Sequence, residues 1–332
     1  MSSQAGIFYF DEREIAGYEA DAIRGWVRFD GYEAPTSHRR AGVFFAHAAW
    51  RLNSGTPRQT QPFLGQTCAV TFDGRLDNRK DLLLRLGSAL GADTSDAALA
   101  AAAYEAWGTE GLAHLIGDWS LVIWDRIRKA ILLASDFAGV RPLYYCVQPN
   151  RVFWSTRLQP LVDWAQPNEI DDGYVAGLLA HGGCPNRTPY RGVYPVPAGH
   201  AVVVTADGAR IRPFWRPPFA DTIRYSHESE YEDHLRSLFR EAVRCRVPTD
   251  APCLCELSGG LDSSSVVSMA AEMMRTGEVK AERFVTLSFE HEGSLDKPFY
   301  TAVEQLYGLE SVHVSTADYP FVTETDAGGA LP

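Results

Sequence analysis

The segment with the clearest chemical potential is a short run rich in glycine and serine. It reads Ser258-Gly259-Gly260-Leu261-Asp262-Ser263-Ser264 and lies between an apolar run at residues 252–257 and a helical pattern at residues 261–275. Glycines allow backbone N–H groups to approach an anion without a Cβ in the way. The start of a helix adds unsatisfied N–H donors and the positive end of the helix dipole. The run therefore predicts a phosphate-binding loop, but not a Walker A loop, because the terminal Gly-Lys of that motif is missing.

Asp262 is the residue in this loop that indicates a metal ion. A carboxylate inside a phosphate cradle repels its ligand unless a divalent cation lies between them, and Mg²⁺ binds to carboxylate and phosphate oxygens together. We therefore expect Asp262 to hold Mg²⁺ against a bound phosphate. The alternative is that Asp262 only stabilises the start of the helix through the helix dipole, with the glycines forming a structural turn.

The elements around the loop alternate between helix and strand. A helix is expected at residues 229–246, with Ser229 and Glu232 as its capping box. The elements after it are a strand at 252–257, a helix at 261–275, a strand at 284–289, a helix at 297–306 and a strand at 311–315. This order predicts an α/β architecture in which parallel strands are joined by helices.

The chain before this region has a different pattern, in which neighbouring strands pair with one another. The expected hairpins join residues 119–124 to 130–135 and residues 143–147 to 151–155. Helices are expected at residues 79–86, at 96–107 with Ser95 as N-cap, and at 173–180. Local pairing of this kind favours an α+β architecture. A proline-rich linker at residues 212–228 then separates a first domain, residues 1–211, from a second, residues 229–332.

The composition excludes some classes of partner. The 332 residues include 31 Lys plus Arg and 42 Asp plus Glu, a formal net charge of −11, which argues against sequence-independent nucleic-acid binding. No apolar run approaches the ~20 residues that span a bilayer, and the N-terminus lacks the pattern of a signal peptide. We therefore expect a cytoplasmic protein without a membrane partner. The six cysteines are scattered and expected to be reduced, and a metal site at Cys253 and Cys255 is the alternative for that pair.

The sequence of the glycine-serine loop resembles the PP-loop of ATP pyrophosphatases, and specifically that of the asparagine synthetase family. The resemblance implies that the loop binds the pyrophosphate of ATP and that the cofactors are ATP and Mg²⁺. It implies transfer of AMP to a substrate carboxylate with release of pyrophosphate, followed by capture of the acyl-adenylate by a nitrogen nucleophile. The adenine would lie against residues 284–289, near the backbone of Leu257 and near Leu287.

The first domain resembles the same family in several segments. These segments are Trp50-Arg51-Leu52, residues 72–78 (FDGRLDN, similar to NGEIYN), Ser95-Asp96, residues 136–144 (DFAGVRPLY, similar to RD-x-x-G-x-x-PLY) and Pro197-Ala198-Gly199-His200. They imply a class II glutamine amidotransferase domain, which has an N-terminal-nucleophile fold of four layers, αββα.

The chemistry of that domain is expected to be lost. The family begins Cys-Gly-Ile, with the thiol as nucleophile, and the residues matched to it here are Ala5-Gly6-Ile7. A methyl group cannot attack an amide. The Asn and Glu that hold glutamine in the family are matched by Asp73 and Arg75, whereas Arg51, Gly74 and Asp96 are kept. The alternative nucleophile is Ser2, exposed by removal of Met1, but we expect it to lie away from the end of the strand.

An amidotransferase scaffold without its cysteine resembles two branches of the family, the β-lactam synthetases and the lasso-peptide macrocyclases. In both branches the amine belongs to the substrate, so the resemblance implies an intramolecular amide bond. The synthetase domain of the family continues beyond the stretch matched here, so the chain is expected either to be a fragment or to need a second polypeptide that supplies the remainder. Asp296 and Asp318 are the last acidic residues considered for a further metal contact, and both are expected to be structural.

Other functions stay open at this point. One alternative is a conventional glutamine-hydrolysing asparagine synthase, and another is a non-catalytic fragment or regulatory module that keeps the fold. A PP-loop enzyme that modifies tRNA is a third, but the acidic charge of the chain argues against it.

Overall fold

The computed structural model describes residues 2–40, 42–50, 61–87, 90–91, 93–167, 169–182, 184–219, 222–248, 251–291, 293–315 and 317. The chain divides into two compact units, with the boundary in the connecting segment at residues 220–221. β12 (Gly208–Pro213) is the last strand of the first unit and α6 (Glu228–Arg244) is the first helix of the second. No described helix is both long and apolar enough to cross a membrane.

Two six-stranded antiparallel sheets form the first unit. The first sheet has the order β10 (Val193–Pro195), β8 (Tyr144–Gln148), β9 (Arg151–Ser155), β1 (Ser2–Tyr9), β3 (Val43–Ala49) and β2 (Thr36–Arg40). The second has the order β12, β11 (His200–Thr205), β7 (Ala130–Ser135), β6 (Gly117–Asp125), β5 (Cys68–Leu76) and β4 (Phe63–Leu64). The hairpins β6–β7 and β8–β9 are those expected from the sequence, and both are antiparallel.

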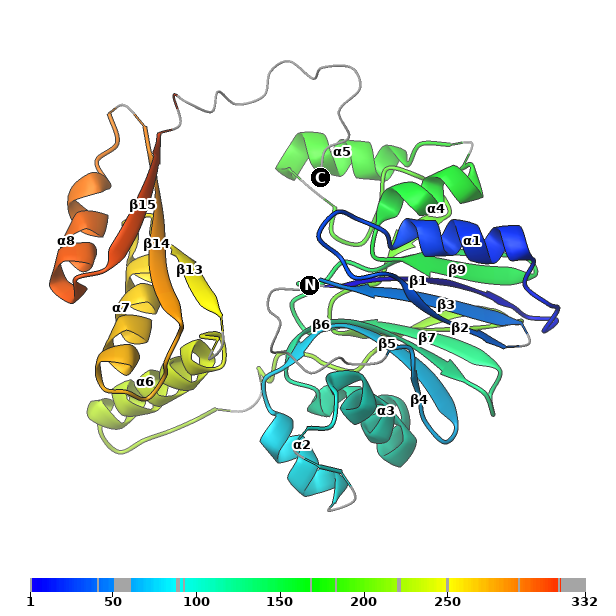
Figure 1. The fold of residues 1–332 in the computed structure, drawn as a ribbon, viewed down its shortest axis with the longest axis horizontal. Helices are drawn as coiled ribbons and strands as arrows, with labels where there is room; N and C mark the ends of the chain where they lie inside the picture. The colour runs from blue at the N-terminus through cyan, green and yellow to red at the C-terminus, as the bar shows by residue number, and fades with distance from the viewer. Residues whose placement is uncertain are drawn as a thin grey trace. The chain divides into compact units, whose positions relative to one another are not determined.

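Helices cover the outer face of each sheet (Figure 1). The helices on the first sheet are α1 (Gly17–Trp26) and α4 (Leu158–Ala165), and those on the second are α2 (Arg79–Leu86) and α3 (Asp96–Trp107). A 3-10 helix (Gly108–His114) follows α3, and α5 (Asp172–His181) follows α4. The aromatic residues Phe8, Phe45 and Trp154 of the first sheet pack between the sheets against Val122 and Leu133 of the second. The predicted αββα fold is therefore confirmed.

Local signals explain where several of these helices begin. The Ser95 side chain accepts a hydrogen bond from the N–H of Ala98, and the Asp171 side chain accepts one from the N–H of Tyr174, as N-cap residues do. The capping box predicted at Ser229 and Glu232 is wrong. α6 begins one residue earlier than expected, so the carboxylate that accepts the N–H of His227 belongs to Glu230, at 2.8 Å.

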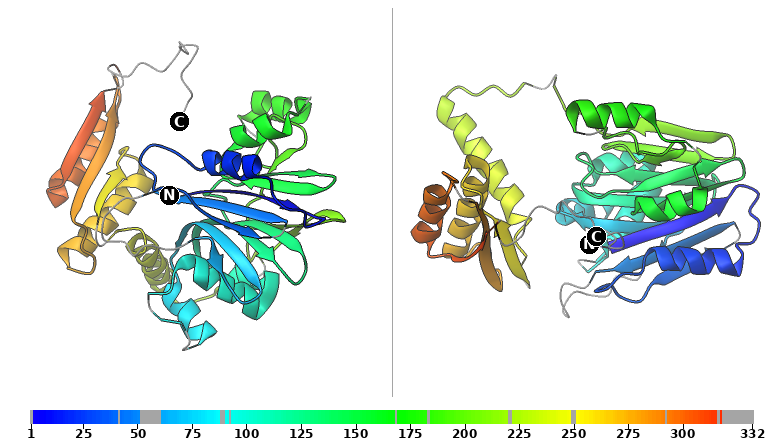
Figure 2. Two further views of the ribbon diagram at one scale, coloured as in Figure 1. Left: turned by 45° about the vertical axis from the view of Figure 1, so that its right-hand side comes forward. Right: turned by 90° about the horizontal axis from the view of Figure 1, so that it is seen from above.

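The second unit contains a three-stranded parallel sheet with the order β13 (Pro252–Glu256), β14 (Arg283–Glu290) and β15 (Glu310–Ser315). α7 (Leu261–Arg275) connects β13 to β14, and α8 (Lys297–Tyr307) connects β14 to β15. Both crossovers bring their helices to the same face of the sheet, as Figure 2 shows. Val267 of α7 and Tyr300 of α8 share one core with Leu257, so the expected βαβαβ architecture is confirmed.

The opposite face of this sheet has no helix on it within the described part of the chain. Leu254, Phe289 and Val312 project from the three strands on that face and are 62%, 48% and 45% exposed. Parallel sheets are normally covered on both faces, so this apolar face is unusual for a folded domain.

Candidate functional site

The glycine-serine loop connects the end of β13 to the first turn of α7. Gly259 has a φ of +87°, and a Cβ at this position would lie 2.8 Å from the carbonyl oxygen of Asp296. The first of the two glycines is therefore required both by the backbone conformation and by the close approach of the residue before α8. Gly260 is the N-cap residue of α7 and has extended backbone angles.

The serines close the loop on itself. The hydroxyl oxygens of Ser258 and Ser263 lie 3.0 Å apart, and the N–H of Ser258 donates to the Ser263 hydroxyl at 3.2 Å. The first intrahelical hydrogen bond of α7 is donated by the N–H of Ser264 to the carbonyl of Gly260, at 3.1 Å. Among the described residues no protein acceptor faces the N–H groups of Leu261, Asp262 or Ser263, so the start of α7 presents free donors to an anion.

Asp262 lies exposed in the first turn of α7, and no described side chain forms an ion pair with it. No group of three or more His, Cys, Asp or Glu residues suited to a metal ion occurs in the described residues. Mg²⁺ commonly binds one or two carboxylates and completes its shell with phosphate oxygens and water. A single exposed carboxylate beside free N–H donors therefore fits a Mg²⁺ ion that arrives with a phosphate ligand, and does not fit a metal site made of protein ligands alone.

The two leucines predicted near the adenine have different environments. The Leu257 side chain is fully buried in the core of the second unit. Its N–H donates to the carbonyl of Leu287 at 2.8 Å, and its carbonyl accepts the Ser288 hydroxyl at 2.8 Å. Leu287 lies on the open face of the sheet, in register with Val312. The hydrogen bonds of Leu257 therefore fix the start of the loop to β14.

Replacing Gly259 by alanine should disturb this loop specifically. The positive φ and the contact with Asp296 together should cost about 1–2 kcal/mol. We expect the Gly259→Ala variant to keep its helix content and to bind magnesium–ATP about tenfold more weakly than wild type. Gly277→Ala is the matched control, because Gly277 also has a positive φ but a Cβ there would meet no atom within 4 Å. Unchanged ATP binding in Gly259→Ala would contradict the role given to the loop.

In the first unit, Ser2 rather than Ala5 lies at the start of the strand. The N–H and hydroxyl of Ser2 both donate to Asp73 Oδ1, at 2.7 and 2.8 Å. Ala5 is fully buried inside β1 and pairs with Ala46 and Ser155. The expectation that Ser2 lies away from the end of the strand is therefore wrong. Sequence matching missed this position because the Ala-Gly-Ile triplet lies within the strand, whereas the start of the strand is set by pairing with β3.

The other residues matched to the glutamine pocket are fixed by a close backbone approach at Gly74 and by ion pairs at Arg75 and Asp96. Gly74 has a φ of +139°, and a Cβ there would lie 2.0 Å from the carbonyl oxygen of Asp118. The guanidinium of Arg75 contacts the carboxylates of Asp118 and Asp77, at 3.4 and 3.5 Å. Asp96 accepts the N–H of Leu76 at 3.0 Å and forms an ion pair with Arg79. Burial raises the pKa of Asp96, and the Arg79 guanidinium opposes that effect. Arg51 and Asp318 lie outside the described residues.

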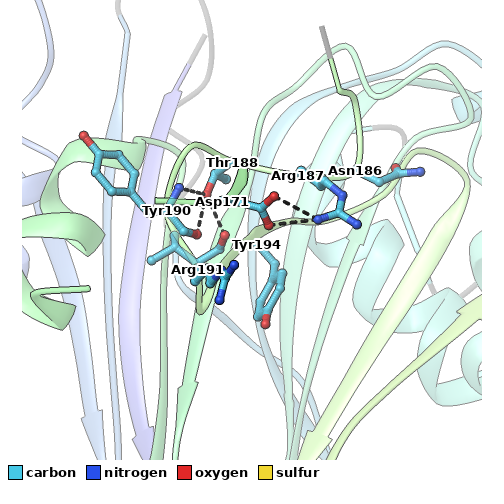
Figure 3. A pocket seen from close by; sticks show the side chains of 8 residues that line it. Asp171, Asn186, Arg187, Thr188, Tyr190, Arg191 and Tyr194 are labelled. Carbon is cyan, nitrogen blue, oxygen red and sulfur yellow. Dashed lines mark hydrogen bonds and ion pairs between the residues drawn. The ribbon is translucent and has the colours of Figure 1, made fainter. Parts of the chain in front are cut away.

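A cavity of about 490 Å³ lies beside the start of α5 (Figure 3). Arg187 and Arg191 line it, and both guanidinium groups are paired locally. Arg187 Nη1 lies 2.9 Å from both carboxylate oxygens of Asp171, and Arg191 Nη1 lies 2.7 Å from Glu169. Because these charges already compensate one another, the cavity does not form a second charged binding site.

Comparison with known proteins assigns both units. Residues 5–215 match the family described as glutamine amidotransferase domain, and residues 234–322 match the family described as asparagine synthase. The chain belongs to the family described as glutamine amidotransferase domain, and part of its second unit is similar to the asparagine synthase family. It is 27% identical over 244 residues to asparagine synthetase [glutamine-hydrolyzing] 3 of Bacillus subtilis, covering 69% of this chain and 38% of that protein.

Two further curated proteins are similar to part of this chain. Carboxyethyl-arginine beta-lactam-synthase of Streptomyces clavuligerus is 32% identical over 212 residues, covering 62% of this chain and 38% of that protein. Amidase chyE of Penicillium rubens is 30% identical over 193 residues, covering 55% of this chain and 28% of that protein. The chain therefore spans roughly a third of the length of the curated relatives it matches.

Proposed function

We propose that this chain carries the nucleotide-binding part of an ATP-dependent synthetase that joins a carboxylate to an amine. The observation that carries the proposal is the start of α7, where free N–H groups, serine hydroxyls and the exposed Asp262 lie together. This combination suits the pyrophosphate end of ATP, because donors and a magnesium-binding carboxylate are both present. The resemblance to asparagine synthetases supports the same chemistry.

In the proposed reaction, a carboxylate oxygen of the acyl substrate attacks the α-phosphorus of ATP, and pyrophosphate leaves as that bond breaks. An uncharged amine then attacks the acyl carbon, AMP leaves, and the amine nitrogen releases a proton. The N–H groups of Leu261 and Ser263 and the Ser258 hydroxyl would stabilise the negative charge that grows on the departing pyrophosphate. Mg²⁺ held by Asp262 would supply further neutralisation of the phosphate charge.

We also propose that the first unit has no glutaminase activity and that the substrate supplies the amine. Hydrolysis of an amide passes through a tetrahedral intermediate whose oxygen is negative and requires hydrogen-bond donors. An ionised carboxylate only accepts hydrogen bonds, and Asp73 Oδ1 already accepts one from the Ser2 hydroxyl. Asp96, the acidic residue matched to the glutamine pocket, already forms an ion pair with Arg79. These contacts support a β-lactam synthetase-like or lasso-peptide cyclase-like reaction that closes a ring within one substrate.

The open face of the parallel sheet supports a further partner. Leu254, Phe289 and Val312 leave an apolar surface at which helices of a complete synthetase domain would pack. We propose that a second polypeptide supplies this layer together with the residues that assist amide formation.

The function is tested by two measurements on the full chain. The first is direct binding of ATP in the presence of Mg²⁺, and we expect saturable binding that becomes weaker when EDTA removes the metal. The second is exchange of labelled pyrophosphate into ATP, measured with the remainder of the synthetase domain supplied as a second polypeptide and with a mixture of carboxylate substrates. Binding without exchange would favour the non-catalytic module, and absence of binding would contradict the nucleotide site itself.

The loss of glutaminase activity has its own test. We expect the purified chain to release no ammonia from glutamine above the level of a heat-inactivated sample. The Ser2→Cys variant should also be inactive, because the Asp73 carboxylate would still repel the developing oxyanion. Ammonia release by wild type that disappears in Ser2→Ala would show instead that Ser2 is a working nucleophile.

A further inference from the structure

Two cysteines lie in contact on the strand that leads into the phosphate-binding loop. Cys253 and Cys255 alternate with Leu254 along β13, so their side chains project from the same face of the sheet. Their sulfur atoms are 3.7 Å apart, and both residues are partly exposed. The other four cysteines form no sulfur–sulfur contact in the described part of the chain, so this pair is distinct from the scattered thiols expected from the sequence.

The two thiols have unequal chemistry. The hydrogen bond between the two thiols, in which either sulfur can be the donor, lowers the pKa of Cys253 to about 7 and raises the pKa of Cys255. Cys253 is therefore the stronger nucleophile near neutral pH, with a second thiol in contact to react with whatever forms on it.

We propose that Cys253 and Cys255 form a reversible oxidation site that closes to a disulfide in the presence of a peroxide. The Cys253 thiolate attacks one oxygen of the peroxide, the O–O bond breaks, and a sulfenic acid forms as hydroxide leaves. The Cys255 sulfur then attacks the sulfenic sulfur, and the displaced hydroxyl leaves as water with the Cys255 proton. The two thiols are oxidised by two electrons in total, the peroxide is reduced, and a dithiol reductant reverses the change.

Formation of the disulfide should displace the phosphate-binding loop that follows β13. The sulfur atoms must approach from 3.7 Å to about 2 Å, and the Cα atoms of a disulfide are usually less than about 6.8 Å apart. Two residues of extended strand already span ~6.6–6.8 Å, so the bond favours a shortened, puckered strand. β13 is an edge strand that pairs only with β14 among the described strands. Its backbone therefore deforms more easily than that of a central strand.

The consequence for ATP rests on the proposed function. Leu257 follows β13 directly and is tied to β14 through the carbonyl of Leu287 and the hydroxyl of Ser288. A puckered β13 should weaken these hydrogen bonds and displace Ser258, the first residue of the loop. We expect the oxidised chain to bind magnesium–ATP about tenfold more weakly than the reduced chain.

The covalent step can be measured without any ligand. Trypsin cuts after Arg246 and Arg275, and the peptide between them contains Cys253 and Cys255 and no other cysteine. The full chain is treated with hydrogen peroxide, free thiols are alkylated, and the peptide is analysed by mass spectrometry. We expect a mass lower by two hydrogen atoms with no alkyl group, and recovery of two alkyl groups after dithiothreitol. Two alkyl groups on the cysteines without reduction, or irreversible addition of oxygen to both cysteine sulfurs, would overturn the proposal.

The effect on nucleotide binding is measured on the same samples. Cys253→Ser and Cys255→Ser should each bind ATP equally well before and after peroxide, because neither can form the bond. Cys245→Ser is the matched control, since it removes a partly exposed thiol from the same unit and should respond to peroxide as wild type does. Disulfide formation with unchanged ATP affinity would overturn the link to the loop. Failure of the reduced chain to bind ATP would count against the proposed function, whereas the peptide masses would still decide the oxidation site.

Discussion

The Asp262→Asn variant should bind magnesium–ATP about 30-fold more weakly than wild type, a loss of ~2 kcal/mol. The carboxylate lies exposed in the first turn of α7 without a charged partner among the described residues, so no ion pair within the protein is broken by the change. The main effect should therefore appear in ligand binding, and the temperature of unfolding should fall only slightly, through the lost interaction with the helix dipole. Isothermal titration of the full chain with ATP in excess Mg²⁺ measures it.

The effect of Asp262→Asn on ATP affinity should change sign when the metal is removed. Without Mg²⁺ the Asp262 carboxylate repels the phosphates, so in EDTA the Asp262→Asn variant should bind ATP as well as wild type or better. Asp207→Asn is the matched control, because Asp207 lies exposed in the turn before β12 of the other unit, and it should leave binding unchanged in both conditions. Equal affinity of Asp262→Asn and wild type for magnesium–ATP would remove the metal role of Asp262 and favour the helix-dipole explanation.

The sequence predicts best where structure depends on neighbouring residues. Ser95 caps α3 through the N–H of Ala98, a contact within a few residues, and the β6–β7 hairpin closes over a short turn. The parallel sheet of the second unit follows from the alternation of strands and helices, because right-handed crossovers leave few topologies. The predicted start of α6 differs from the observed start by one residue, because Glu228, Glu230 and Glu232 all suit a first helical turn.

The sequence predicts poorly where contacts join distant parts of the chain. Ser2 meets Asp73 across 71 residues, and only the pairing of β1 with β3 and β9 fixes which residue lies at the strand end. The Ala-Gly-Ile triplet matched to the nucleophile lies instead in the buried part of β1. The contact between Cys253 and Cys255 could have been anticipated from their spacing, because alternate residues of a strand share a face. The hydrogen bond between their thiols depends on rotamers that a sequence does not specify.

Acidification to about pH 4 should lower the free energy of unfolding of the first unit by about 3 kcal/mol, because His47 is protonated in the unfolded chain first. Burial lowers the pKa of His47 from 6.5 to about 4 in the folded protein, and the Glu33 carboxylate and the backbone of Phe72 oppose this only partly. Its Nε2 is buried without a hydrogen-bond partner among the described residues. Between pH 6.5 and 4 the unfolded chain binds a proton at this histidine and the folded chain does not. Stability from this site is therefore complete above pH 6.5 and falls as the pH decreases toward 4.

Urea unfolding from pH 7 to pH 4.5 measures this dependence, with the fluorescence of Trp119 and Trp154 in the first unit as a probe. The His47→Gln variant should be less stable at pH 7, because its amide needs partners that the site does not provide, but its stability should fall less on acidification. His38→Gln is the matched comparison. Burial also lowers the pKa of His38, which is only partly buried, so this variant should reduce the pH dependence by a smaller amount. A slope in His47→Gln as steep as in wild type would mean that His47 is protonated in the folded protein, and that another group drives acid unfolding.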